Sequence, residues 1–240
     1  MAAVLYSLIL PEAASEAGFL AGVTAARLPR NVLQLDLWEH RFPASPVRLY
    51  TLDEPQPARL LWALTRGLGR RLGAAYYYHW DETAAQVELW RVGPEGRERL
   101  FRDQAGRPAD LDYEVRDVFG AELVSAARAS AIQDFRDRYA SREPDEDYTG
   151  LAQAVSLGEQ NLARLDEALF EQAREDLEEE TRRCLLDAVM FHELGVENDV
   201  LLGRTLRPER YPPRSLVLIR SPGFLGLRLG PWTLPPAPES

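Results

Sequence analysis

The chain has 240 residues and a formal net charge of −10, with 45% hydrophobic and 28% charged residues. This composition is typical of a globular protein, and the length suffices for one large or two small domains. All 28 basic residues are arginine, which excludes Schiff-base and phosphate-loop chemistry that needs lysine. The single cysteine excludes an internal disulfide, so we expect a cytoplasmic location.

The charges are distributed unevenly along the chain. Residues 1–140 contain 17 arginines and 19 acidic residues, residues 141–199 contain 5 and 17, and residues 200–240 contain 6 and 2. The acidic balance disfavours a non-specific grip on nucleic acid but allows a local arginine patch. Neither the apolar run at 1–10 nor the one at 215–234 is long and uninterrupted enough to span a bilayer, so we expect no membrane association.

The first half of the chain alternates strand and helix patterns. In chain order these are a strand at 4–10, a helix at 12–26, strands at 32–38 and 47–52, and a helix from 57 to about 66. The two strands separated by a proline turn are expected to form a hairpin. Glycines at 67, 69 and 73 are expected to end the second helix, which places Arg70 and Arg71 in a loop.

An aromatic strand at 74–81 begins a three-stranded meander that continues at 86–92 and 97–103. The first six elements therefore run β-α-β-β-α-β, the order of a ferredoxin-like sandwich. We expect an α+β protein with a ferredoxin-like or related antiparallel sheet packed with helices. A long acidic helix and a short C-terminal β-hairpin are expected to follow.

The second half is predicted to be mainly helical before it turns extended. A helix is expected at 121–139, a second with a narrow apolar stripe at 159–194, and short strands at 215–219 and 224–229. The predicted domains are an α+β domain at 1–140, an acidic linker at 141–150, a helical region at 151–200, and an Arg/Pro-rich extended segment, hairpin and tail at 201–240.

The aromatic strand is the strongest candidate site in the sequence. Alternate residues of a strand point to opposite faces, so Tyr77, His79 and Asp81 share one of them. We expect the other face to be buried, with the rings of Tyr76, Tyr78 and Trp80. A histidine beside a carboxylate can act as an oriented base. The same residues also suit a binding surface or ordinary surface pairing.

Two further groups are candidates for partner binding. Trp90 on the next strand, with Arg70 and Arg71, would extend the face that carries Tyr77 and His79. On the long helix the acidic side chains could dock a basic partner or the protein's own basic tail, and they also suit a simply solvated face. These side chains are Glu171, Glu175, Glu178 and Glu179.

The sequence carries no recognised cofactor or catalytic motif. The spacing of His40, His79 and His192 matches no metal site, and no serine stands in a Gly-x-Ser-x-Gly elbow. Cys184 lies near the apolar stripe of the long helix, where a packing role is typical. We therefore expect no cofactor and no metal, and the residues identify no family.

The leading hypothesis is a non-enzymatic protein-binding adaptor, regulator or immunity-type partner. The first alternative is a metal-independent enzyme that binds or processes RNA or DNA, in which His79, Asp81 or His40 is catalytic and Arg70 and Arg71 clamp the transition state. The second alternative is a self-associating structural protein, a homodimer through the helix at 162–189.

Overall fold

The computed structural model describes residues 4–11, 14–26, 28, 34–42, 46–52, 57–104, 111–140, 167–221 and 224–230. The chain divides into two compact units. The first consists of residues 1–105 and 193–240 and contains the sheet, whereas the second consists of residues 106–192 and its described part is helical. The sheet unit therefore takes its elements from both ends of the chain, and the sequence-based domain boundaries stay a prediction.

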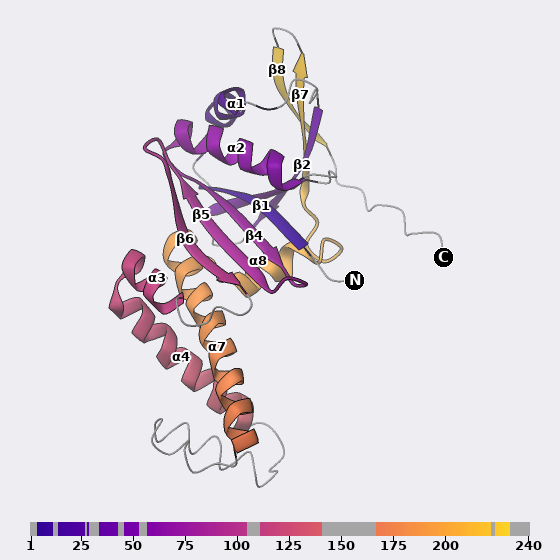
Figure 1. Ribbon diagram of the computed structural model, residues 1–240. Helices are drawn as coiled ribbons and strands as arrows, with labels where there is room; N and C mark the ends of the chain where they lie inside the picture. The colour runs from indigo at the N-terminus through magenta and orange to yellow at the C-terminus, as the bar shows by residue number, and fades with distance from the viewer. Residues whose placement is uncertain are drawn as a thin grey trace. The chain divides into compact units, whose positions relative to one another are not determined.

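The first unit is built on one antiparallel sheet of eight strands, in the order β6-β5-β4-β1-β3-β2-β7-β8 (Figure 1). Its strands are β1 (Val4–Pro11), β2 (Gln34–Arg41), β3 (Val47–Leu52), β4 (Ala75–Asp81), β5 (Gln86–Val92), β6 (Arg97–Gln104), β7 (Arg214–Ser221) and β8 (Phe224–Gly230). The predicted α+β class is confirmed. The pairing of β2 with β3 and the meander of β4, β5 and β6 also match expectation.

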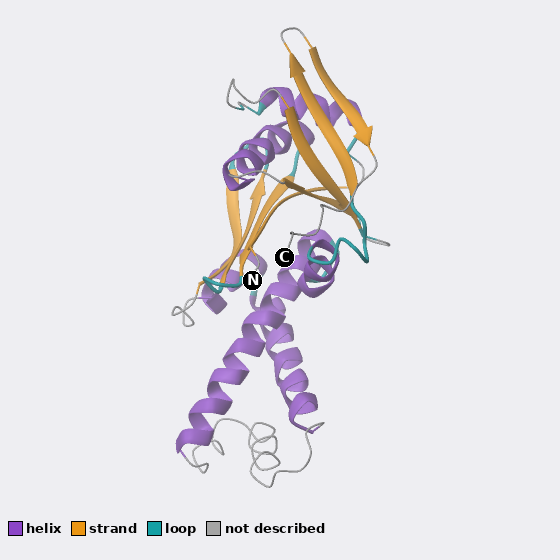
Figure 2. Cartoon of the chain, turned by 90° about the vertical axis from the view of Figure 1, so that its right-hand side faces the viewer, coloured by secondary structure: helices purple, strands orange, loops and turns teal. Residues whose placement is uncertain are grey.

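The C-terminal strands join this sheet. β7 pairs with β2 along its length, from Gln34 opposite Ile219 to Glu39 opposite Arg214, and β8 pairs with β7. The sequence predicted these two strands as a short C-terminal hairpin and did not indicate what they pair with. They extend the sheet beyond β2, as the side view in Figure 2 shows.

Helices α1 (Glu16–Ala25) and α2 (Pro57–Leu72) lie side by side on one face of the sheet (Figure 1). The predicted end of α2 near residue 66 is wrong, because the helix continues for six more residues to Leu72. Its glycines serve close packing. A Cβ at Gly67 would stand 2.4 Å from the Gly22 carbonyl oxygen of α1, and one at Gly69 would stand 2.3 Å from the Val92 carbonyl oxygen.

The opposite face of the sheet is also covered within this unit. The Tyr78 hydroxyl donates to the Asn198 side-chain oxygen at 2.5 Å, and Tyr76 donates to Glu193 at 3.2 Å. Asn198 begins α8 (Asn198–Thr205), a short helix that the sequence analysis did not predict. Both contacts bring residues near 195 onto β4, and they explain why this strand is buried from two sides.

The described part of the second unit consists of α3 (Leu111–Phe119), α4 (Ala121–Ala140) and α7 (Glu167–Leu194), whose last two residues belong to the first unit. Gly120, with φ of +88°, allows the chain to turn between α3 and α4. The expected linker at 141–150 lies outside the described residues. Among the described helices, none has the length and apolar character needed to cross a membrane.

Candidate functional site: an arginine pocket around a buried glutamate

The candidate site is positioned by the alternation of side chains along β2. Leu35 and Leu37 point to the helix-covered face and are at most 1% exposed. Two residues farther on the same face is Glu39, which is only 3% exposed. A buried carboxylate at the end of an apolar row requires compensating charge and hydrogen bonds.

The neighbouring strands supply this compensation. Tyr50 of β3 and Arg214 of β7 are the residues directly opposite Glu39 on its two sides. The Tyr50 hydroxyl donates to Glu39 Oε1 at 3.1 Å, and Arg41 Nε donates to Oε2 at 3.1 Å. Arg48 approaches Oε1 at 3.7 Å and Arg214 approaches Oε2 at 3.8 Å. One carboxylate thus stands among three guanidinium groups.

These side chains line a cavity of about 230 Å³. Its wall is completed by the start of α1, where the Ser15 side chain caps the helix by accepting from the Gly18 amide at 3.1 Å. The lining residues are Ala14, Ser15, Glu16, Phe19, Glu39, Arg41, Arg48, Tyr50, Arg214 and Leu216. Because a helix N-terminus also carries partial positive charge, the cavity favours anions.

The wall of the cavity is rich in hydrogen-bond donors. Each guanidinium carries five N–H donors, whereas Glu39 offers two oxygens that already accept bonds from Tyr50 and Arg41. The side chains of Arg41 and Arg214 are 52% and 43% exposed, so solvent and solutes reach them. Burial raises the pKa of Tyr50 above its usual 10, and the Glu39 carboxylate adds to this rise. Tyr50 therefore remains a donor at neutral pH.

This site was not among the candidates predicted from the sequence. Part of its signal was present, because the predicted strands at 32–38 and 47–52 carry Tyr50 and lead into Glu39. The alternation of side chains along a strand predicts that Glu39 and Arg41 lie on the same face as Leu35 and Leu37. Arg214 carried no such signal, since it is 173 positions beyond Arg41 in the chain and reaches the site only through the pairing of β7 with β2.

The predicted solvent face of the aromatic strand is in part wrong. Tyr77 is 8% exposed and belongs to the core under α2, where its ring meets Trp62 edge-on at 5.0 Å. The face expected to be buried is buried at Tyr76 and Tyr78, at 8% and 0% exposure. Both faces of β4 are therefore covered, and Tyr77 acts first as a packing residue.

His79 and Asp81 lie farther along β4, half-buried. The His79 ring stacks on Tyr6 at a centroid distance of 4.5 Å, and its buried Nε2 has no hydrogen-bond partner among the described residues. Burial lowers the pKa of His79, while Glu88 and Asp81 act in the opposite direction. Asp81 itself accepts from the Ala84 amide at 2.9 Å and so fixes the turn after β4.

Trp90 sits in an aromatic and arginine cluster at the edge of the helix layer. Its ring lies 5.7 Å from Trp62, and the Arg97 and Arg99 guanidinium carbons stand 5.5 and 5.8 Å from the ring centroid. The Trp90 indole also donates to Glu88 at 3.3 Å. Trp90 is partly buried against the core and keeps an accessible edge, which stays compatible with partner contact.

The remaining histidine and arginine candidates do not assemble with His79. His40 is 6% exposed on the face of β2 opposite Glu39, and its Nε2 is 3.1 Å from the Thr51 hydroxyl. β2 and β4 are separated by two strands, or about 14 Å. Arg70 and Arg71 were expected in a loop, but they stand exposed in the last turn of α2. The two histidines therefore lie on separate strands of the described sheet, and the catalytic roles of these residues stay a prediction.

The glutamate side chains of the acidic helix α7 differ in exposure. Glu175 and Glu179 are exposed, Glu178 pairs with Arg182 at 3.7 Å, and the side chain of Glu171 lies outside the described part. Glu180, which was not among the candidates, is 2% exposed. On the stripe predicted as a dimer interface, Leu185 and Val189 are already fully buried within one chain.

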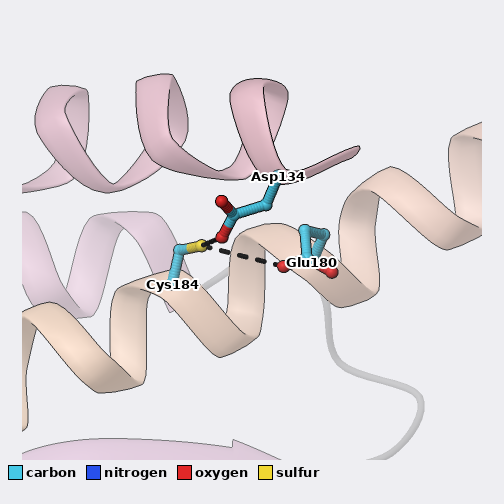
Figure 3. A group of neighbouring side chains, drawn as sticks. All are labelled: Asp134, Glu180 and Cys184. Atoms are coloured by element: carbon cyan, nitrogen blue, oxygen red, sulfur yellow. Dashed lines mark hydrogen bonds between the residues drawn. The ribbon is translucent and has the colours of Figure 1, made fainter. Parts of the chain in front are cut away.

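Glu180 belongs to a cluster that has the composition of a metal site. Asp134 of α4 and Glu180 and Cys184 of α7 offer ligand atoms within 4.8 Å of one another (Figure 3). Arg183 pairs with both carboxylates, at 2.8 Å from Asp134, and burial raises the pKa of the Cys184 thiol to about 11. A protonated thiol and a bound guanidinium favour an ion-pair cluster joining α4 to α7 over a cation site.

Comparison with known proteins adds no relative. No protein-family model, curated protein or solved structure matches this chain. The fold and the pocket define an α+β protein with a cationic cavity on the helix-covered side of a large antiparallel sheet. A function for this protein therefore has to be argued from the cavity itself.

Proposed function

We propose that this protein is a binding protein that recognises an anionic group in the cavity around Glu39. The observation that carries the proposal is the convergence of Arg41, Arg48 and Arg214 on one buried carboxylate at the wall of an open cavity. Guanidinium groups bind carboxylates and phosphates through directed, charge-assisted hydrogen bonds.

The proposal keeps the leading sequence-based hypothesis, a binding protein such as an adaptor, regulator or immunity-type partner, and moves its site from the aromatic strand to the arginine pocket. For the framework we propose a ferredoxin-like core. The support is the element order β1-α1-β2-β3-α2-β4 together with the sheet order β4-β1-β3-β2, in which every neighbouring pair is antiparallel.

The alternative of an enzyme acting on RNA or DNA requires an arginine groove that passes a histidine. The residues that line the cavity include three arginines and no histidine. Arg91 and Arg102, on the meander, are paired with acidic residues. The geometry therefore favours a compact anion pocket over a nucleic-acid track.

The test uses sulfate as the probe and thermal unfolding as the readout, at constant ionic strength set with sodium chloride. Sulfate should raise the Tm of the wild-type protein, because a ligand that binds only the folded state stabilises it. Arg214→Gln should weaken the derived affinity by about tenfold or more, as expected for loss of a charged hydrogen-bond donor. Isothermal titration calorimetry would provide the dissociation constants.

Arg66→Gln is the matched control, because Arg66 is an exposed arginine of α2 that does not line the cavity. It changes the net charge by the same amount and should leave sulfate binding unchanged. Equal losses of affinity in the two variants would indicate non-specific attraction and contradict the proposal. So would a wild-type protein that sulfate does not stabilise.

A further inference from the structure

We infer that the anion taken by this cavity is the dianionic group of a phosphate monoester. This inference rests on the proposed function and specifies its ligand class. It follows from the charge of the inner wall, from the directions in which its donors point, and from the size of the cavity.

The described lining has a formal charge of +1, from three arginines and the two glutamates Glu39 and Glu16, and the N-terminus of α1 adds about half a positive charge. A carboxylate or a phosphodiester carries one negative charge and would leave the wall positive. A phosphate monoester carries a charge of about −1.5 to −2 near neutral pH and would balance it. Glu16, in the first turn of α1, and Arg41 are both exposed, so solvent screens the two opposite charges alike.

The donors converge from separate strands. Arg41 comes from β2, Arg48 from β3 and Arg214 from β7, and the N-terminus of α1 closes another side. A planar carboxylate can use one guanidinium fork fully, whereas the three terminal oxygens of a phosphate accept bonds from several directions at once. A donor set spread over three strands and a helix end therefore matches a tetrahedral acceptor.

The size of the cavity limits the ligand to the anionic group itself. Its volume of about 230 Å³ lies below the roughly 300–1,000 Å³ of pockets that enclose whole small molecules. The remainder of the ligand must therefore extend into solvent. Glu39, Tyr50 and Glu16 are the ionisable lining residues besides the arginines, and burial keeps Tyr50 protonated by raising its pKa.

The experiment measures the affinity of the full chain for four probes by calorimetry at pH 7.5 and pH 5. The probes are ethyl phosphate, dimethyl phosphate, sulfate and acetate. Ethyl phosphate should bind about tenfold or more tightly than dimethyl phosphate at pH 7.5, because the diester has one charge and one terminal oxygen fewer. It should weaken by about tenfold at pH 5, since its second ionisation lies near pH 6.

Sulfate is the control for titration of the protein, because it remains dianionic at both pH values. The affinity for sulfate should be the same at both pH values. If it falls at pH 5 as much as the affinity for ethyl phosphate does, a group of the protein is being protonated and the inference is overturned. Equal binding of dimethyl phosphate and ethyl phosphate, or of acetate and ethyl phosphate, would also overturn it while leaving an anion site intact. Failure of all four probes to bind would overturn the proposed function as well.

Glu39→Gln provides an independent variant, because it raises the formal charge of the lining by one unit and keeps a side chain of similar size. The preference for ethyl phosphate over dimethyl phosphate should then widen, since the added positive charge attracts a dianion more strongly than a monoanion. An unchanged preference would contradict the charge-balance argument. A phosphoserine peptide serves as a fifth probe. If it binds much more tightly than ethyl phosphate, the phosphate belongs to a protein partner. If the two affinities are equal, the phosphate belongs to a small ester.

Discussion

Glu39 and His40 are neighbours on β2 whose side chains lie on opposite faces of the sheet. Glu39 is 3% exposed and holds its charge through contacts with three arginines and Tyr50. His40 is 6% exposed, and burial lowers its pKa to about 4 from 6.5. At a similar depth, burial lowers the pKa of His40, whereas Glu39 is surrounded by guanidinium groups.

His40 should make the stability of the protein fall as the pH decreases. Between pH 6.5 and pH 4 the unfolded chain binds a proton at this residue and the folded chain does not, so protonation favours unfolding in that window. His40→Gln should remove this contribution. The unfolding free energy of both proteins is measured in urea at pH 7.5 and at pH 5. The decrease between these pH values should be about 2 kcal/mol smaller in the variant than in the wild-type protein. Parallel pH profiles would contradict the assignment.

At the scale of elements, α2 shows how glycines can extend a helix instead of ending it. Gly67 and Gly69 allow α2 to approach α1 and β5 at distances that a side chain would prevent. Glycine in a helix interior costs conformational free energy, but the close packing that it allows here stabilises the protein by more than this cost. The helix ends only at Gly73, whose φ of +93° suits glycine.

Two alanine substitutions at helical glycines should therefore have opposite effects. Gly67→Ala places its Cβ 2.6 Å from Ala26 and 2.4 Å from the backbone of Gly22, so it should destabilise the protein by about 1–3 kcal/mol. Gly203→Ala in α8 meets nothing within 4 Å and should stabilise by about 0.5–1 kcal/mol. Urea unfolding of both variants tests this contrast, and effects of the same sign would contradict the packing role of Gly67.

At the scale of the whole molecule, the sheet unit depends on a strand from the far end of the chain. β7 covers the edge of β2 and buries Leu216 and Leu218, which are 4% and 1% exposed. It also carries Arg214 into the pocket. One pairing therefore closes the core and completes the candidate site.

A chain that ends at residue 213 should lose both contributions. It lacks two buried leucines, each worth about 2–5 kcal/mol, and it leaves β2 as an unpaired edge prone to association. We expect a lower midpoint in urea and a larger mass by light scattering. Leu218→Ala is the comparison, because it removes one buried side chain, keeps Arg214 and should retain sulfate binding; a truncated chain as stable as this variant would contradict the role of β7.

The identity and order of most elements could be predicted from local sequence patterns, including β1, the β2–β3 pair and the meander from Ala75 to Gln104. The reason is that strand alternation and helical periodicity are local and survive in a single sequence. The sequence also predicted Cys184 as a packing residue, which is 7% exposed. The short helices α3 and α8 were not predicted, because each contains too few residues to show a clear apolar periodicity.

Only the tertiary structure decided which residues meet. Alternation sets Tyr77 and Tyr78 on opposite faces of β4, but both are buried because α2 covers one face and Asn198 contacts the other. The run of glutamates at 178–180 looks uniform in sequence, yet Glu180 alone is buried. Arg214 joins Glu39 through a pairing between distant strands. Such long-range choices depend on the sum of burial over the whole sheet, which no local pattern contains.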